Sequence, residues 1–210
     1  IKHGHLITIS ITGEPTSGKS TVGLMIKDEV NDFIIKEKKN NKIDPYETIA
    51  SDQIEGNRIF TGNKFEHACI LIDEWSALGT TGENATTESS LFEFYNNVCA
   101  QRYIHRVTCT PQTDSVFDRN SLILIDVITR DDERTETICK VYYNDPTSQF
   151  LTKTPLGIVR INVKDTLKKK YYARYRKKKF ARLDLLDKHG IRDIRELEYS
   201  DIILEVYESM

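Results

Sequence analysis

Apolar runs of strand length alternate with segments of helical periodicity over the first half of the chain. Residues 6–12 alternate β-branched and polar side chains, as a strand does, and apolar side chains recur at helical spacing over 20–36. Residues 68–72 are continuously apolar, which is typical of a strand buried on both faces of a parallel sheet. A helix over 90–101 and a strand over 105–110 follow. This order predicts an α/β core with a mainly parallel sheet flanked by helices.

The second half of the chain predicts a change of architecture. Two β-rich runs, 121–129 and 135–143, are separated by a charged turn, which predicts an antiparallel hairpin. Residues 159–163 form a candidate last strand. Earlier in the chain the pattern is weaker, and it predicts only short strands around 48–50 and 58–60.

A helical pattern fills the last fifty residues. It breaks at Gly190, which suits a C-terminal cap, and a new helix is predicted over 202–208. The sequence therefore predicts two parts, a core over 1–163 and a basic helical C-terminal extension over 164–210 that packs on it.

The charge is distributed unevenly along the chain. The totals of 30 Lys+Arg and 32 Asp+Glu give a net charge of −2. Nine basic residues and no acidic one lie between Thr166 and Leu183, which leaves 21 basic against 32 acidic residues, a formal charge of −11, in the rest. The nine are Lys168, Lys169, Lys170, Arg174, Arg176, Lys177, Lys178, Lys179 and Arg182.

Two interpretations of the basic helix 168–182 stay open, and both can hold at once. Tyr171 and Tyr175 are four residues apart and share a helix face, while basic side chains on the other faces suit contacts with nucleic-acid phosphates. Alternatively, the aromatic stripe docks on the core and the charges are simply solvated.

The remaining composition points to an ordinary reduced protein. The cysteines, Cys69, Cys99, Cys109 and Cys139, lack metal-binding spacing and read as small core residues. No apolar run approaches the roughly 18 to 20 residues of a membrane span. Without a recognisable targeting segment, we expect a cytoplasmic protein.

A phosphate-binding loop follows the first predicted strand. Residues 13–20 match G-x-x-x-x-G-K-[ST] and precede the first predicted helix. Lys19 is expected to bridge the β- and γ-phosphates of ATP, and the hydroxyl of Ser20 to bind Mg²⁺. The nucleotide-binding residues predicted here are Gly13, Glu14, Pro15, Thr16, Ser17, Gly18, Lys19, Ser20 and Thr21.

Polar side chains also follow the next two predicted parallel strands. Asp73 and Glu74 come directly after the apolar run 68–72, at the sheet edge where ligands bind. Asp73 is suited to hold Mg²⁺, usually through a water, and Glu74 to polarise the attacking water as a general base. Gln112 follows the strand 105–110 and is either a sensor of the γ-phosphate and lytic water or an ordinary turn residue.

These elements together resemble the FtsK/HerA superfamily of P-loop motor ATPases, including small genome-packaging ATPases of membrane-containing archaeal viruses. Residues 100–112 are similar to that family's segment of a basic residue, a short spacer, an apolar strand and Thr-Gln, although Pro111 separates Thr110 from Gln112. The similarity covers 6–143. It implies a RecA/ASCE-like P-loop NTPase fold with a C-terminal antiparallel hairpin and a helical tail.

The resemblance also implies a function and partners. Such proteins form a homo-oligomeric ring, usually a hexamer, that hydrolyses ATP between subunits and moves double-stranded DNA through a central channel. The implied role is packaging of a viral genome, in the host cytoplasm or on the virion, with a capsid or membrane protein as a further partner and no insertion into the membrane. Arg102 is the preferred arginine supplied to the neighbouring site, with Arg106 and Arg119 as alternatives.

Two other function classes share the P-loop. A small-molecule kinase would transfer phosphate to a nucleoside or nucleotide, but it gains little from Glu74 beside Asp73, because water activation wastes ATP. An ATP-gated assembly module would bind nucleotide with little turnover. Both stay open as alternatives to the DNA motor.

Overall fold

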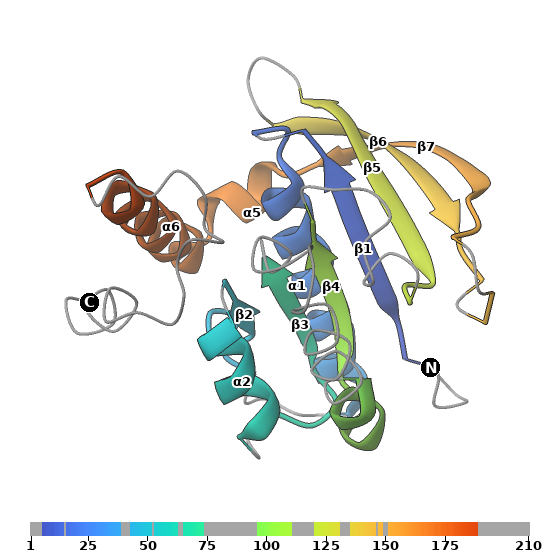
Figure 1. The fold of residues 1–210 in the computed structure, drawn as a ribbon, viewed down its shortest axis with the longest axis horizontal. Coiled ribbons are helices and arrows are strands. Elements are labelled where there is room, and N and C mark those ends of the chain that lie inside the picture. Colours follow the sequence, from blue (N-terminus) through green and yellow to red (C-terminus); the bar gives the residue numbers. More distant parts are fainter. Residues whose placement is uncertain are drawn as a thin grey trace, which may run out of the picture.

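A single seven-stranded sheet forms the frame of the molecule (Figure 1). The computed structural model describes residues 6–14, 16–38, 43–51, 53–62, 65–73, 96–110, 120–130, 135–145, 147–148 and 151–188. The strands are β1 (Thr8–Gly13), β2 (Ile49–Ala50), β3 (Cys69–Asp73), β4 (His105–Cys109), β5 (Ile123–Arg130), β6 (Glu136–Tyr143) and β7 (Thr154–Asn162). The helices with defined bounds are α1 (Lys19–Lys38), α2 (Gln53–Thr61), α5 (Lys164–Lys168) and α6 (Lys170–Lys188).

The strand order β2-β3-β4-β1-β5-β6-β7 places the P-loop strand at the centre of the sheet. Strands β2, β3, β4, β1 and β5 run parallel, and β6 and β7 extend the sheet antiparallel. The predicted P-loop α/β fold with a C-terminal hairpin is therefore confirmed. The first strand of that hairpin, β5, also pairs in parallel with β1, from Ile9↔Ile123 to Gly13↔Val127.

Two predicted elements differ from the structure. The short strand expected at 58–60 is wrong, because these residues lie within α2, where Ile59 and Phe60 are buried against the sheet. Three residues are too few to distinguish a strand period from a helical one. The last strand, predicted at 159–163, begins earlier, since β7 runs from Thr154 to Asn162.

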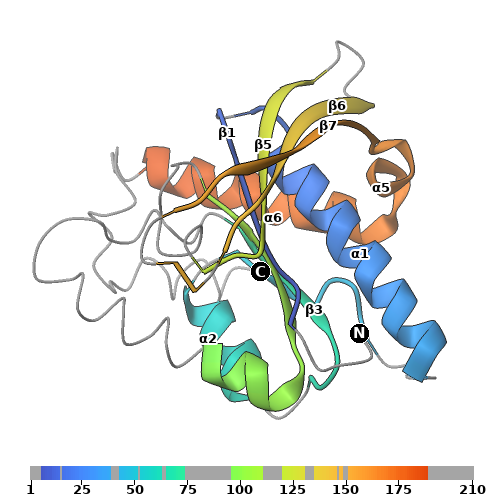
Figure 2. The same cartoon turned by 90° about the vertical axis from the view of Figure 1, so that its right-hand side faces the viewer.

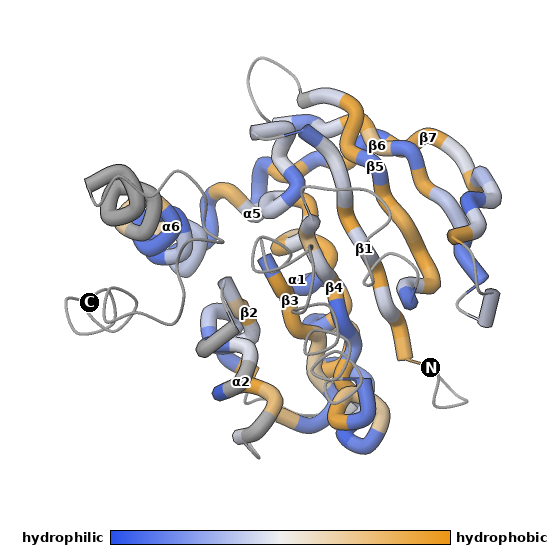
Figure 3. Tube along the Cα trace, in the orientation of Figure 1, coloured by the Kyte–Doolittle hydropathy of each residue, from blue (hydrophilic) through white to orange (hydrophobic). Residues whose placement is uncertain are grey.

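Apolar side chains pack on both faces of the central strands. Along β3, Cys69 and Leu71 join the cluster beneath α1, whereas Ile70 and Ile72 join the cluster beneath α2. Figure 2 shows α1 on one side of the sheet and α2 on the other. Figure 3 shows apolar stretches along these strands, as expected for strands buried on both faces.

Side chains of the C-terminal helical segment pack in the core cluster beneath α1. Val163, at the start of α5, and Tyr172 and Tyr175 of α6 belong to the core cluster beneath α1. The predicted break at Gly190 and the helix over 202–208 lie outside the described residues. Within the ranges that the structure describes, no helix has the length and apolarity needed to cross a membrane.

Helix α1 approaches the sheet closely at Gly23. A Cβ atom on this residue would lie 2.8 Å from both Cys109 Sγ and Leu71 Cδ1. Such a contact is shorter than carbon and sulfur atoms tolerate, so the missing side chain lets α1 sit directly on β3 and β4. This close packing fixes the start of α1 against β3 and β4.

Replacing Gly23 with valine should destabilise the fold. We expect Gly23→Val to lower the free energy of unfolding by about 2 kcal/mol, because the added methyl groups overpack the core. Urea denaturation followed by circular dichroism measures the effect, with Glu29→Ala, an exposed position on α1, as the control. An unchanged or increased stability of Gly23→Val would contradict the close packing.

Candidate nucleotide site

The loop between β1 and α1 has the backbone conformation of an anion-binding loop. Gly13, Thr16 and Gly18 have φ values of 145°, 65° and 100°. A Cβ atom on Gly13 would lie 2.8 Å from the Val127 carbonyl oxygen, so the loop packs tightly against β5. Backbone N–H groups in such a turn, followed by a helix N-terminus, form a site suited to phosphate.

Side chains of the loop supply further hydrogen-bond donors. The Lys19 ammonium donates to the carbonyl oxygens of Gly13 at 2.6 Å and Glu14 at 2.8 Å, so it lies over the loop. The hydroxyl of Ser17 is buried and has no hydrogen-bond partner among the described residues. A buried donor without a partner is costly unless a ligand satisfies it. The loop therefore fits a bound phosphate, as predicted for ATP.

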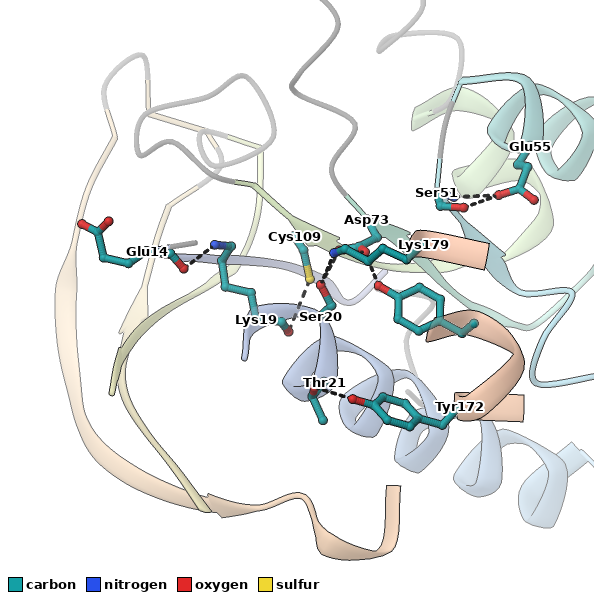
Figure 4. Close-up of polar contacts among 11 residues, drawn as sticks. Glu14, Lys19, Ser20, Thr21, Ser51, Glu55, Asp73, Cys109, Tyr172 and Lys179 are labelled. Carbon is teal, nitrogen blue, oxygen red and sulfur yellow. Dashed lines mark hydrogen bonds and ion pairs between the residues drawn. The ribbon is translucent and has the colours of Figure 1, made fainter. Parts of the chain in front are cut away.

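The two residues predicted to bind Mg²⁺ lie in contact. Ser20 Oγ donates a hydrogen bond of 2.8 Å to Asp73 Oδ1, as shown in Figure 4. Asp73 ends β3, and Ser20 lies in α1, which follows β1. Strand β4 lies between β3 and β1, and Cys109 at its end donates to the Lys19 carbonyl oxygen at 3.6 Å. Asp73 is only 1% exposed. A hydroxyl beside a buried carboxylate is an oxygen donor set suited to Mg²⁺.

Helix α6 contributes three side chains that the sequence analysis did not place at this site. Tyr175 donates its hydroxyl hydrogen to Asp73 Oδ2, and Tyr172 OH lies 3.4 Å from Thr21 Oγ1. Lys179 Nζ lies 3.1 Å from both Asp73 Oδ2 and Ser20 Oγ. Their spacing of three and four residues puts them on one helix face, which is the signal that could have identified them.

Burial holds the Tyr175 hydroxyl in its protonated form. Desolvation raises the pKa of Tyr175 well above its ordinary value, and the adjacent Asp73 carboxylate raises it further. A protonated phenol can only donate to the carboxylate beside it. Tyr175 therefore fixes the orientation of Asp73 at neutral pH.

Further contacts between α6 and the core are also electrostatic. Lys178 of α6 pairs with Glu55 on α2, and Lys169, between α5 and α6, pairs with Asp28 at 2.6 Å. The acidic core and the basic helix thus meet within one chain. The structure shows Tyr172 and Tyr175 docked on the core, as the second interpretation of the basic helix predicts.

Other predicted site residues lie outside the described residues or away from the loop. Pro15, Glu74, Gln112 and Arg119 lie outside the described residues. Arg102 Nη1 donates to the carbonyl oxygens of Phe60 at 3.3 Å and Gly62 at 2.7 Å, at the end of α2. Arg102 precedes β4, which runs parallel to β1, so it lies at the sheet edge opposite its own P-loop.

Of the two candidate arginines that the structure describes, Arg106 is the less accessible. Its side chain is 1% exposed, and its Nη1 donates to Asn96 Oδ1 at 2.7 Å. Desolvation lowers the pKa of Arg106 to about 10. A guanidinium buried in this way is not presented to a neighbouring subunit.

The strand, loop and helix geometry and the Ser20–Asp73 contact decide the fold type. The fold is that of a P-loop NTPase. No protein-family model matches the chain, and no curated protein matches it significantly.

Several solved structures are similar to the chain. The genome-packaging NTPase B204 of Sulfolobus turreted icosahedral virus 2, in complex with AMPPCP, is 12% identical, with 72% of this chain and 98% of that chain covered and a TM-score of 0.34. The N-terminal domain of zonular occludens toxin from Neisseria meningitidis is 12% identical, with coverages of 74% and 96% and a TM-score of 0.37. At these TM-scores the likeness carries no argument about substrate or partner.

Removing the Ser20 hydroxyl should separate nucleotide binding from its magnesium dependence. We expect Ser20→Ala to raise the Mg²⁺ concentration for half-maximal nucleotide binding by about tenfold, because one metal ligand is lost. Binding of a fluorescent ATP analogue in EDTA is the internal control, and it should change little because Lys19 and the loop remain. An equal loss of binding with and without Mg²⁺ would contradict a metal-binding role for Ser20.

Proposed function

We propose that the chain is an ATP-hydrolysing motor that translocates double-stranded DNA and packages a viral genome into a capsid. The observation that carries the hydrolytic part is the contact of Ser20 with the buried Asp73 beside a P-loop. The DNA-translocating part and the hexameric ring rest on the sequence resemblance. A capsid or membrane protein of the virion is the further partner that this function requires.

Each residue at the site has a proposed role in hydrolysis. Lys19 binds the β- and γ-phosphates, while Ser20 and Asp73 hold the metal. When bound, Mg²⁺ supplies positive charge that offsets the charge of the phosphates. Glu74, directly after Asp73, accepts a proton from the attacking water, and Gln112 positions that water.

A neighbouring subunit completes the proposed site. Arg102 lies at the sheet edge opposite its own P-loop, so it would serve the site of an adjacent copy and not its own. Its guanidinium would stabilise charge that develops on the γ-phosphate. The ring is therefore the proposed catalytic unit.

The outward face of α6 supports a contact with DNA phosphates. Lys170, Arg174, Arg176 and Lys177 are exposed on this helix. Two of them stack on aromatic rings, Arg174 at 4.0 Å from the centroid of Tyr46 and Arg176 at 5.2 Å from that of Phe180. Exposed cations held in this way bind phosphates without reading the base sequence.

Long duplex DNA should stimulate ATP hydrolysis by the chain. We expect at least about a threefold rise in rate, together with a duplex affinity that falls steeply with salt as phosphate contacts are lost. A phosphate-release assay with and without duplex measures the rise, and Lys19→Ala, which loses nucleotide binding, is the control. Healthy hydrolysis that long duplex leaves unchanged would contradict the motor.

Substituting the proposed general base should block turnover but not binding. We expect Glu74→Gln to bind ATP normally and to hydrolyse it about a hundredfold or more slowly, because the amide cannot accept the proton of water. Nucleotide titration and single-turnover hydrolysis measure the two effects. An assembly function that persists in Glu74→Gln would favour the ATP-gated module, and transfer of labelled γ-phosphate to a nucleoside would favour the kinase.

A further inference from the structure

A lysine from the C-terminal helix lies where the metal of the site would bind. The ammonium of Lys179 is 3.1 Å from Ser20 Oγ and 3.1 Å from Asp73 Oδ2 (Figure 4). Ser20 and Asp73 are also the residues expected to hold Mg²⁺. The ammonium of Lys179 thus contacts both side chains whose oxygen atoms are expected to bind Mg²⁺.

The two cations would compete because they need the same two oxygen atoms. Ser20 gives its hydroxyl proton to Asp73 Oδ1, which as a carboxylate oxygen can only accept. The hydroxyl oxygen therefore accepts from Lys179, and Mg²⁺ would need the space beside this oxygen and Asp73 Oδ2 that the ammonium occupies. Repulsion between the two positive charges further opposes their presence together.

Neighbouring contacts hold this lysine in register with the site. Tyr172 contacts Thr21 and Tyr175 contacts Asp73, so the inner face of α6 lies along the start of α1 and the end of β3. The pair of Lys178 with Glu55 fixes the same turn of α6 from the α2 side. Lys179 itself remains 27% exposed, whereas the Asp73 side chain is 2% exposed. A long, partly solvated side chain can move away from Ser20 and Asp73 while Tyr172 and Tyr175 keep their contacts.

We propose that Lys179 is a built-in competitor of Mg²⁺. In the metal-free state its ammonium neutralises the buried Asp73, and it must leave before the metal and nucleotide are held together. Lys179 thereby sets the magnesium requirement of nucleotide binding. This inference rests on the proposed function, because it concerns regulation of the same site.

The magnesium dependence of nucleotide binding tests the competition. The 210-residue chain is titrated with Mg²⁺ in the presence of a fluorescent, non-hydrolysable ATP analogue. We expect Lys179→Met to lower the Mg²⁺ concentration for half-maximal binding about three- to tenfold, the effect of removing a competing ion pair of roughly 1 kcal/mol. Lys164→Met removes the same charge from an exposed position on α5 and should leave the concentration unchanged.

A second measurement uses the wild-type chain and needs no variant to fold. Acetylation of individual lysines is followed by peptide mass spectrometry with and without Mg²⁺ and the analogue. We expect Lys179 to react about threefold or more faster in their presence, because release exposes its amine, while Lys177 serves as the internal reference.

The outcomes separate this inference from the proposed function. An unchanged or raised Mg²⁺ requirement in folded Lys179→Met would overturn the competition, and so would unchanged or slower acetylation of Lys179. If the wild type binds no nucleotide at any Mg²⁺ concentration, the proposed function fails and the inference fails with it.

Discussion

The structure depends on the burial of one carboxylate, that of Asp73. A buried charge is strongly unfavourable unless it is paired and hydrogen-bonded. Three donors from two other elements satisfy it, namely Ser20 from α1 and Tyr175 and Lys179 from α6. The positions of the P-loop helix α1, strand β3 and the C-terminal helix α6 are therefore mutually dependent.

Local patterns were enough to predict most of the central sheet. The run 68–72 is apolar because both of its faces are buried, and the loop motif 13–20 places a strand before it and a helix after it. The pairing of β1 with β5 could not be predicted, since it joins residues more than a hundred positions apart and is selected by tertiary packing. The helix at α2 was missed for a similar reason, because contact with the sheet decides its conformation.

The candidate site also has a part that the sequence predicts and a part that it does not. The meeting of Ser20 with Asp73 follows from a general rule, that parallel strands end at one edge of a sheet. Composition could not predict that α6 contributes to the site, because the lysines that face the site and those that face solvent are chemically the same. Helical phase separates Lys179, which faces the site, from Lys177, which is exposed, and the phase is set by the burial of Tyr172 and Tyr175. Glu74 and Gln112 stay predictions from the sequence.

A short, largely helical segment connects β7 to the Lys179 end of this contact. Val163 is anchored in the core, and Lys179 follows only sixteen residues later in a largely helical segment. A group tethered over so short a distance has an effective concentration on the order of millimolar or more at its contact point. The ammonium therefore returns to Asp73 by an intramolecular step whose equilibrium does not depend on protein concentration. Dilution therefore leaves this contact unchanged.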